Sequence, residues 1–88
     1  FYVLDRQSGE LLNANPYTYV NWATHVDMKT GRPVETPFSR YEKFNMQIAP
    51  SPIGGHNWQA MAYNPVTKLV YIPSREMSYL YGNRKDFI

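Results

Sequence analysis

The 88-residue sequence contains no cysteine, so it can form neither a disulfide framework nor a thiolate metal site of its own. It has no apolar run approaching the roughly 18 residues that a membrane helix requires, and no charged start followed by an apolar stretch. No segment sustains the spacing of an amphipathic helix. These absences exclude a disulfide-stapled module and predict neither a membrane span nor a targeting signal within these residues.

Charge is low and nearly balanced. Nine basic and seven acidic side chains give a net charge of +2, an excess too small to indicate an acidic partner. The hydrophobic fraction of 43% is too high for the disordered class of proteins. The two histidines, His25 and His56, lie far apart and have no carboxylate at metal-ligand spacing, so the sequence predicts no zinc or iron site.

Aromatic residues are abundant and favour an all-β fold. They make up 16% of the chain and include eight tyrosines, a residue type enriched in strands. Short strand candidates alternate with turn signals, which predicts antiparallel hairpins. Residues 1–5 are largely apolar on both faces, as expected for a strand buried between stacked sheets.

One turn chemistry occurs three times. The sequence DRQSG at residues 5–9 is followed by DMKTG at residues 27–31 and by NPVTK at residues 64–68. The first side chain can accept from backbone amides two residues on, and a glycine in fifth place tolerates positive φ. Lys68 replaces that glycine, at a cost on the order of 1 kcal/mol if its φ is positive. Tight hairpins are predicted at the first and third turns, and the two aspartates are assigned to turns rather than to catalysis.

Proline is dense in the middle of the chain. Four of the seven prolines are Pro33, Pro37, Pro50 and Pro52. Because proline cannot donate to a strand ladder, this region is predicted to be mostly connection, with at most a short edge segment near residues 43–48. Residues 75–88 show no clear period and are predicted as loop, with a short helix near residues 76–81 left open.

The most informative segment is GGHNW at residues 54–58. The two glycines let the backbone approach another group closely. Asn57 supplies a donor and an acceptor, while Trp58 adds an aromatic ring with one donor. The segment predicts a ligand-facing corner. On the residues alone, the alternative that Asn57 caps a turn and Trp58 packs between sheets stays open.

Three segments in order resemble the quinoprotein alcohol dehydrogenases, which use pyrroloquinoline quinone (PQQ). They are FYVLDR with its Ser8-Gly9 turn, NWA followed by VDMKTGRP up to Pro33, and GGHNW with the strand LVYIP. Members of that family are several times longer and form a propeller of eight four-stranded blades. The resemblance implies a single partial propeller unit over residues 1–88, equal to about two blades. Blade hairpins are expected at about residues 1–34 and 56–73, and a proline-rich connection at about residues 35–55.

The resemblance also implies a function. The chain is expected to be a fragment of a PQQ-dependent alcohol dehydrogenase that oxidises a primary alcohol by hydride transfer to the quinone. Asn57 and Trp58 are expected to line the cofactor pocket, since amide and indole donors suit the quinone oxygens and an aromatic plane suits its rings. In the intact family a calcium or lanthanide ion acts as Lewis acid and an aspartate takes the alcohol proton. Those residues are expected before Phe1, so the 88 residues alone are not expected to be active.

Location and partners are implied in the same way. The resemblance predicts a periplasmic enzyme that passes electrons to a cytochrome. Because separated blades expose strand edges, association with the remainder of the propeller or with further copies is expected. The chain starts at Phe1 within a predicted strand and without an initiator Met, so a longer parent polypeptide is expected. Trp22, beside the small Ala23, is assigned to packing between sheets.

Two alternatives remain. One is a non-enzymatic β-propeller fragment or binding module that keeps the scaffold without the cofactor. The other is a module that stacks single-stranded nucleic acid on its tyrosines. The sequence shows no clustering of tyrosines with arginines, which disfavours the nucleic-acid reading.

Overall fold

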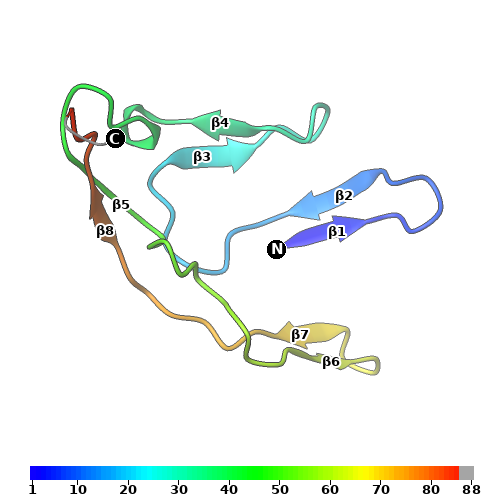
Figure 1. Cartoon of the computed structure of the whole chain (residues 1–88). Coiled ribbons are helices and arrows are strands. Elements are labelled where there is room, and N and C mark those ends of the chain that lie inside the picture. The colour runs from blue at the N-terminus through cyan, green and yellow to red at the C-terminus, as the bar shows by residue number, and fades with distance from the viewer. Residues whose placement is uncertain (86–88) are drawn as a thin grey trace.

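The computed structural model describes residues 1–85, and the described part is all-β, as predicted (Figure 1). The elements are β1 (Tyr2–Leu4), β2 (Leu11–Ala14), β3 (Ala23–Val26), β4 (Pro33–Glu35), the 3-10 turn η1 (Pro37–Ser39), β5 (Met46–Ile48), β6 (Ala62–Asn64), β7 (Leu69–Tyr71) and β8 (Tyr79–Tyr81). Strands β1–β2, β3–β4 and β6–β7 form hairpins, and β5 pairs with β8. All four pairs are antiparallel. Within residues 1–85 no helix is long and apolar enough to cross a bilayer.

The three hairpins share one turn, which confirms the prediction from the repeated sequence. It begins at Asp5, Asp27 and Asn64, respectively. In each turn the Oδ1 atom of this first residue accepts hydrogen bonds from the N–H groups two and three residues on, at 2.8 to 3.3 Å. The N–H of the fifth residue donates to the carbonyl of the first at 2.8 Å. The first side chain therefore holds the turn closed.

The fifth residue of each turn has positive φ. The angle is 76° at Gly9, 70° at Gly31 and 62° at Lys68. Glycine adopts this conformation without a steric penalty, whereas a side chain brings its Cβ too close to the backbone. The strain expected at Lys68 is therefore present, and the β6–β7 hairpin tolerates it.

Strand β8 corrects the loop predicted from residue 75 onward, and the short helix left open near residues 76–81 does not form. Met46 pairs with Tyr81, and Ile48 pairs with Tyr79. The ring of Tyr81 stacks on that of Tyr41 at 5.3 Å between centroids and meets the ring of Tyr79 at 5.5 Å. The ladder to β5 and the aromatic packing override local helix preference, and the sequence next to β8 could not show either. The predicted edge segment near residues 43–48 is confirmed as β5, whereas the loop predicted for residues 86–88 lies outside the described residues.

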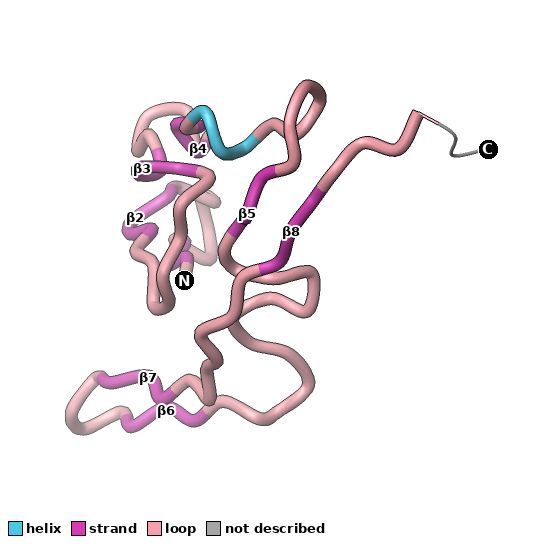
Figure 2. Tube along the Cα trace, turned by 90° about the vertical axis from the view of Figure 1, so that its left-hand side faces the viewer, coloured by secondary structure: helices cyan, strands magenta, loops and turns pink. Residues whose placement is uncertain are grey.

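Little of the chain is buried. Among residues 1–85 the buried side chains are Ile48, Ala49 and Ser51, all in β5 or just after it. The accessible surface is 7529 Å², whereas a compact monomer of this mass exposes about 5400 Å². The radius of gyration is 16.0 Å against about 12 Å for a compact chain of this length. The molecule is open and extended, with the three hairpins projecting as separate arms to the same side of it (Figures 1 and 2).

Strand β1 illustrates this open arrangement. Tyr2, Val3 and Leu4 are all exposed, although both faces of the strand were expected to be covered by stacked sheets. The β3–β4 hairpin faces Tyr2 across a hollow but leaves it 56% exposed. Eight strands match the number in two four-stranded blades, but they form four separate two-stranded sheets. The proposed division at about residues 1–34, 35–55 and 56–73 stays a prediction.

Candidate functional site

The GGHNW segment lies in a bulged loop beside the β6–β7 hairpin. The hairpin ladder runs to the pair Ala62–Tyr71. The two segments then separate and meet again where the N–H of Arg75 donates to the carbonyl of Gly55 at 2.9 Å. Between these pairs six residues, 56–61, face three residues, 72–74. Such extra residues bend one strand away from its partner and change the direction of its side chains. Residues 56–61 are called the site loop below.

Gly55 makes the close backbone approach that the sequence predicted, whereas Gly54 serves a turn. Gly54 has a φ of 73°, and its N–H donates to the carbonyl of Ser51 at 2.8 Å. Gly55 is buried, and a Cβ atom added there would lie 2.7 Å from the hydroxyl of Thr18. Thr18 belongs to the linker between β2 and β3. The missing side chain therefore allows the linker to press directly on the start of the site loop.

Asn57 and Trp58 both face outward. The Nδ2 of Asn57 donates to the carbonyl of Ile53 at 3.3 Å, a long bond of the turn-capping kind. Within residues 1–85 the amide makes no other hydrogen bond, so its Oδ1 and one N–H are free to meet a ligand. Trp58 is 84% exposed and donates no hydrogen bond within this part of the chain. Their assignment to a cofactor pocket stays a prediction.

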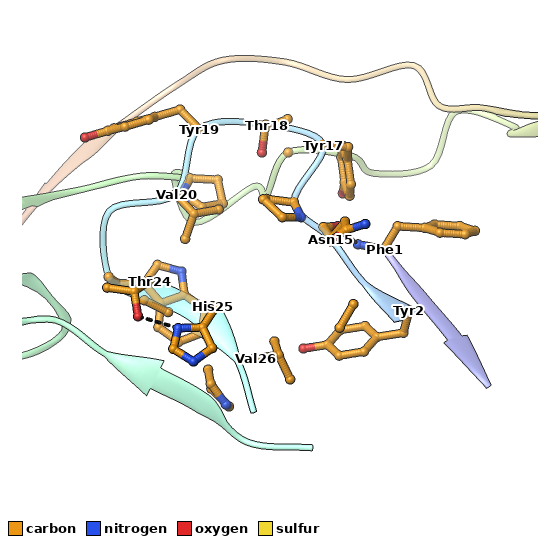
Figure 3. Close-up of a pocket in the computed structure, with 17 residues that line it drawn as sticks. Phe1, Tyr2, Asn15, Tyr17, Thr18, Tyr19, Val20, Thr24, His25 and Val26 are labelled. Carbon is orange, nitrogen blue, oxygen red and sulfur yellow. Dashed lines mark hydrogen bonds between the residues drawn. The ribbon is translucent and has the colours of Figure 1, made fainter. Parts of the chain in front are cut away.

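A second feature is an apolar hollow between the β1–β2 and β3–β4 hairpins (Figure 3). Its volume is about 410 Å³, and rings of Phe1, Tyr2, Tyr17 and Trp22 line it. Trp22 is half-buried at this wall, and its assignment to packing stays a prediction. Neither residue of the predicted cofactor pair lines the hollow. Its lining suits packing against an apolar surface rather than charged chemistry.

The two histidines lie in different parts of the molecule. His25 is on β3 at the hollow, and its Nδ1 lies 2.9 Å from the hydroxyl of Thr24 (Figure 3). His56 opens the site loop, and its Nδ1 lies 2.7 Å from the carbonyl of Pro73. No three His, Asp or Glu side chains among residues 1–85 come close enough together to hold a metal ion.

A central junction, missed from the sequence, joins three segments near the site loop. The Nδ2 of Asn21 donates to the carbonyl of Gln47, and its Oδ1 accepts from the N–H of Ala49, both at 2.9 Å. The Glu76 carboxylate accepts from the N–H of Tyr19 at 3.0 Å. Three distant segments, residues 19–21, 47–51 and 76–77, thus meet immediately before the site loop. Nothing in the spacing of these residues signals the contacts.

The carboxyl groups with altered acidity are turn residues. The pKa of the Asp5 carboxyl lies below its ordinary value of 3.8, chiefly because the backbone N–H of Ser8 donates to it. The pKa of Asp27 is lowered in the same way, with the backbone N–H of Thr30 as the largest cause. Hydrogen bonds to the ionised form explain both shifts. The assignment of these aspartates to turns is therefore confirmed.

Known proteins similar to the chain are several times longer. No protein-family model matches it. Quinohemoprotein alcohol dehydrogenase ADH IIB of Pseudomonas putida is 53% identical over 89 residues, a match that covers all of the chain and 13% of that protein. The solved structure of quinohemoprotein alcohol dehydrogenase ADHIIG from Pseudomonas putida HK5 superposes with a TM-score of 0.85 and is 39% identical. The match covers 97% of the chain and 13% of ADHIIG. The structure of a europium-containing methanol dehydrogenase superposes with a TM-score of 0.75 and is 41% identical, over 83% of the chain and 13% of that dehydrogenase.

Proposed function

The chain belongs to the PQQ-dependent quinoprotein alcohol dehydrogenase family as a segment of its propeller, and we propose that it supplies part of the cofactor pocket of such an enzyme. The full-length polypeptide carrying these residues, called the host below, would oxidise a primary alcohol by hydride transfer to the quinone. The observation that carries the proposal is the match over the whole chain to a quinohemoprotein alcohol dehydrogenase, with Asn57 and Trp58 exposed on a bulged loop.

The donor set of the site loop fits the proposed cofactor. PQQ supplies an ortho-quinone that accepts a hydride, on a flat tricycle with three carboxylates. Within residues 1–85 the Asn57 amide makes one long hydrogen bond, to the carbonyl of Ile53, and its second N–H is free. The indole N–H of Trp58 makes none within these residues, so both side chains can donate to such a ligand. Asn57 would donate to a quinone or carboxylate oxygen, and Trp58 would add an aromatic face. The calcium or lanthanide ion would be held by parts of the host outside this segment.

The remainder of the propeller is the proposed partner of the exposed faces. The surface of the chain exceeds that of a compact monomer by about 2000 Å². Strand edges and apolar side chains left open in this way recruit further strands or sheets. Self-association of the isolated chain through the same edges stays a prediction. We place the host in the periplasm, with a cytochrome as electron acceptor, by analogy with the family.

Substitution of Asn57 in the host tests the proposal. Asn57→Ala removes the amide and leaves a buried ligand oxygen without its donor, which costs about 1–3 kcal/mol. PQQ affinity, measured by titration of the metal-loaded apoenzyme, should fall by roughly 5- to 150-fold. The fold should survive, because the side chain is exposed and its one contact within residues 1–85 is long.

Asn13→Ala provides the matched control. Asn13 is an exposed asparagine on β2 whose side chain makes no hydrogen bond within the described residues, so its loss should leave PQQ affinity unchanged. Unchanged affinity in Asn57→Ala as well would overturn the pocket assignment. It would favour the second candidate, a propeller segment that contributes scaffold only.

A further inference from the structure

A histidine side chain at the start of the site loop forms a hydrogen bond across the bulge. The Nδ1 of His56 lies 2.7 Å from the carbonyl oxygen of Pro73, on the opposite side of the bulge. A carbonyl oxygen can only accept, so Nδ1 carries the proton and donates. His56 directly precedes Asn57, and Pro73 follows the β7 segment. The bond therefore crosses the gap between the six-residue and three-residue sides of the bulge.

Few other hydrogen bonds restrain the backbone around this bond. Gly54 has a φ of 73°, and Gly55 carries no side chain to restrict it. The ladder pairs at Gly55–Arg75 and Ala62–Tyr71 fix the two ends of the bulge, but residues between them have no ladder partner. Asn57 contributes one long contact to Ile53. The bond from His56 is the shortest hydrogen bond that a site-loop side chain makes within residues 1–85.

We propose that His56 is a positioning residue for the cofactor pocket, whose Nδ1–H, bound to the Pro73 carbonyl, holds the backbone of the site loop so that the Asn57 amide faces the quinone. The inference rests on the proposed function, because it assigns His56 a role through Asn57. It assigns no proton transfer to the imidazole. A ligand group held in advance of binding costs less conformational entropy when the ligand arrives.

His56→Leu and His56→Asn in the host separate the donor from the bulk of the ring. Leucine fills similar space without a donor, whereas the Nδ2 of asparagine occupies nearly the place of Nδ1. We expect His56→Leu to raise the dissociation constant for PQQ by roughly 2- to 12-fold, the range for one net hydrogen bond. His56→Asn should restore most of the affinity. His25→Leu is the matched control, since the side-chain hydrogen bond of His25 within residues 1–85 is with its neighbour Thr24 on β3, and the variant should bind PQQ like the parent.

Hydrogen exchange of the apo host gives a readout that does not depend on cofactor. Peptides covering residues 56–61 should exchange faster in His56→Leu than in the parent, while those covering β1 and β2 should not change. The double variant with Asn57→Ala should bind PQQ no more weakly than Asn57→Ala alone, because the histidine is proposed to act through that amide.

The outcomes distinguish the two proposals. If Asn57→Ala leaves PQQ affinity unchanged, the proposed function fails and the positioning role falls with it. If Asn57→Ala weakens binding and His56→Leu does not, only the positioning role is overturned. Equal losses in His56→Leu and His56→Asn would also overturn it, since the donor would then not matter. Should His56→Leu fail to fold, parent-like affinity and exchange in His56→Asn would support the role, and weakened binding there would contradict it.

Discussion

The hairpin turns and the central junction stabilise the same chain over very different distances in sequence. In the turns, Asp5, Asp27 and Asn64 bond to amides two and three residues on. At the junction, Asn21 reaches Ala49 across 28 positions, and Tyr19 reaches Glu76 across 57. Each turn can therefore weaken without affecting the others, whereas loss of a junction residue releases whole segments from one another.

Of the changes that test this comparison, removing Asn21 should lower the stability of the host most. Asn21→Ala in the host leaves the carbonyl of Gln47 and the part-buried N–H of Ala49 without partners. Two lost hydrogen bonds of this kind cost roughly 2–4 kcal/mol. We expect a lower denaturation midpoint and faster hydrogen exchange over residues 46–50, with the three turns unchanged. The Asn13→Ala variant is again the control, and a parent-like midpoint in Asn21→Ala would show that the junction bonds are dispensable.

Exchanging the fifth residues of two turns should have an intermediate effect. Gly9→Lys places a side chain at a φ of 76°, which costs about 1 kcal/mol, although nothing lies within 4 Å of the new Cβ. Lys68→Gly relieves the same strain but adds backbone entropy to the unfolded chain, for a net gain of about 0.5 kcal/mol. Exchange of the turn amides should speed up in the first variant and slow down in the second. The changes in exchange rate must therefore have opposite signs in the two variants, and faster exchange in both would contradict the strain argument.

Removing the charge of one turn should have the smallest effect. The pKa of Asp5 is lowered in the folded state, so its contribution to stability is fully present above its ordinary value of 3.8 and is lost as the pH falls through the lowered value. Asp5→Asn should show slightly less protection of the Gln7 and Ser8 amides at neutral pH. The difference from the parent should vanish in acid. The Asn64 turn, which is already neutral, should show no such pH dependence, and a constant difference at all pH values would contradict this account.

The same contrast explains how far the sequence could predict the structure. The turns are encoded within five residues, so the hairpins and the positive φ at Lys68 could be predicted from side-chain chemistry alone. The close approach at Gly55 was also expected, although its partner Thr18 was not. Strand β8, the junction around Asn21 and the bond from His56 depend on residues distant in sequence, and no local signal marks them.

The family resemblance predicts that the GGHNW segment belongs to the cofactor site, but it could not show how the loop is supported. That information lies in the geometry of the bulge and in the bonds at its edges. The exposed faces of β1 show a second limit of prediction from sequence. Their apolar character was apparent from the sequence, but within residues 1–85 they stay exposed.

The pairing of β5 with β8 has a consequence for how this chain acquires its order. Residues 49–78 form a closed loop between the two strands, and the site loop and the β6–β7 hairpin lie entirely within it. Loop-closure entropy must be overcome before such a distant pair forms, whereas the hairpins close over only a few residues. The hairpins can therefore form early and independently. The contacts that close the bulge around Asn57 reach to Pro73 and Arg75, so within residues 1–85 the residues proposed to meet the cofactor reach their final arrangement after the first two hairpins.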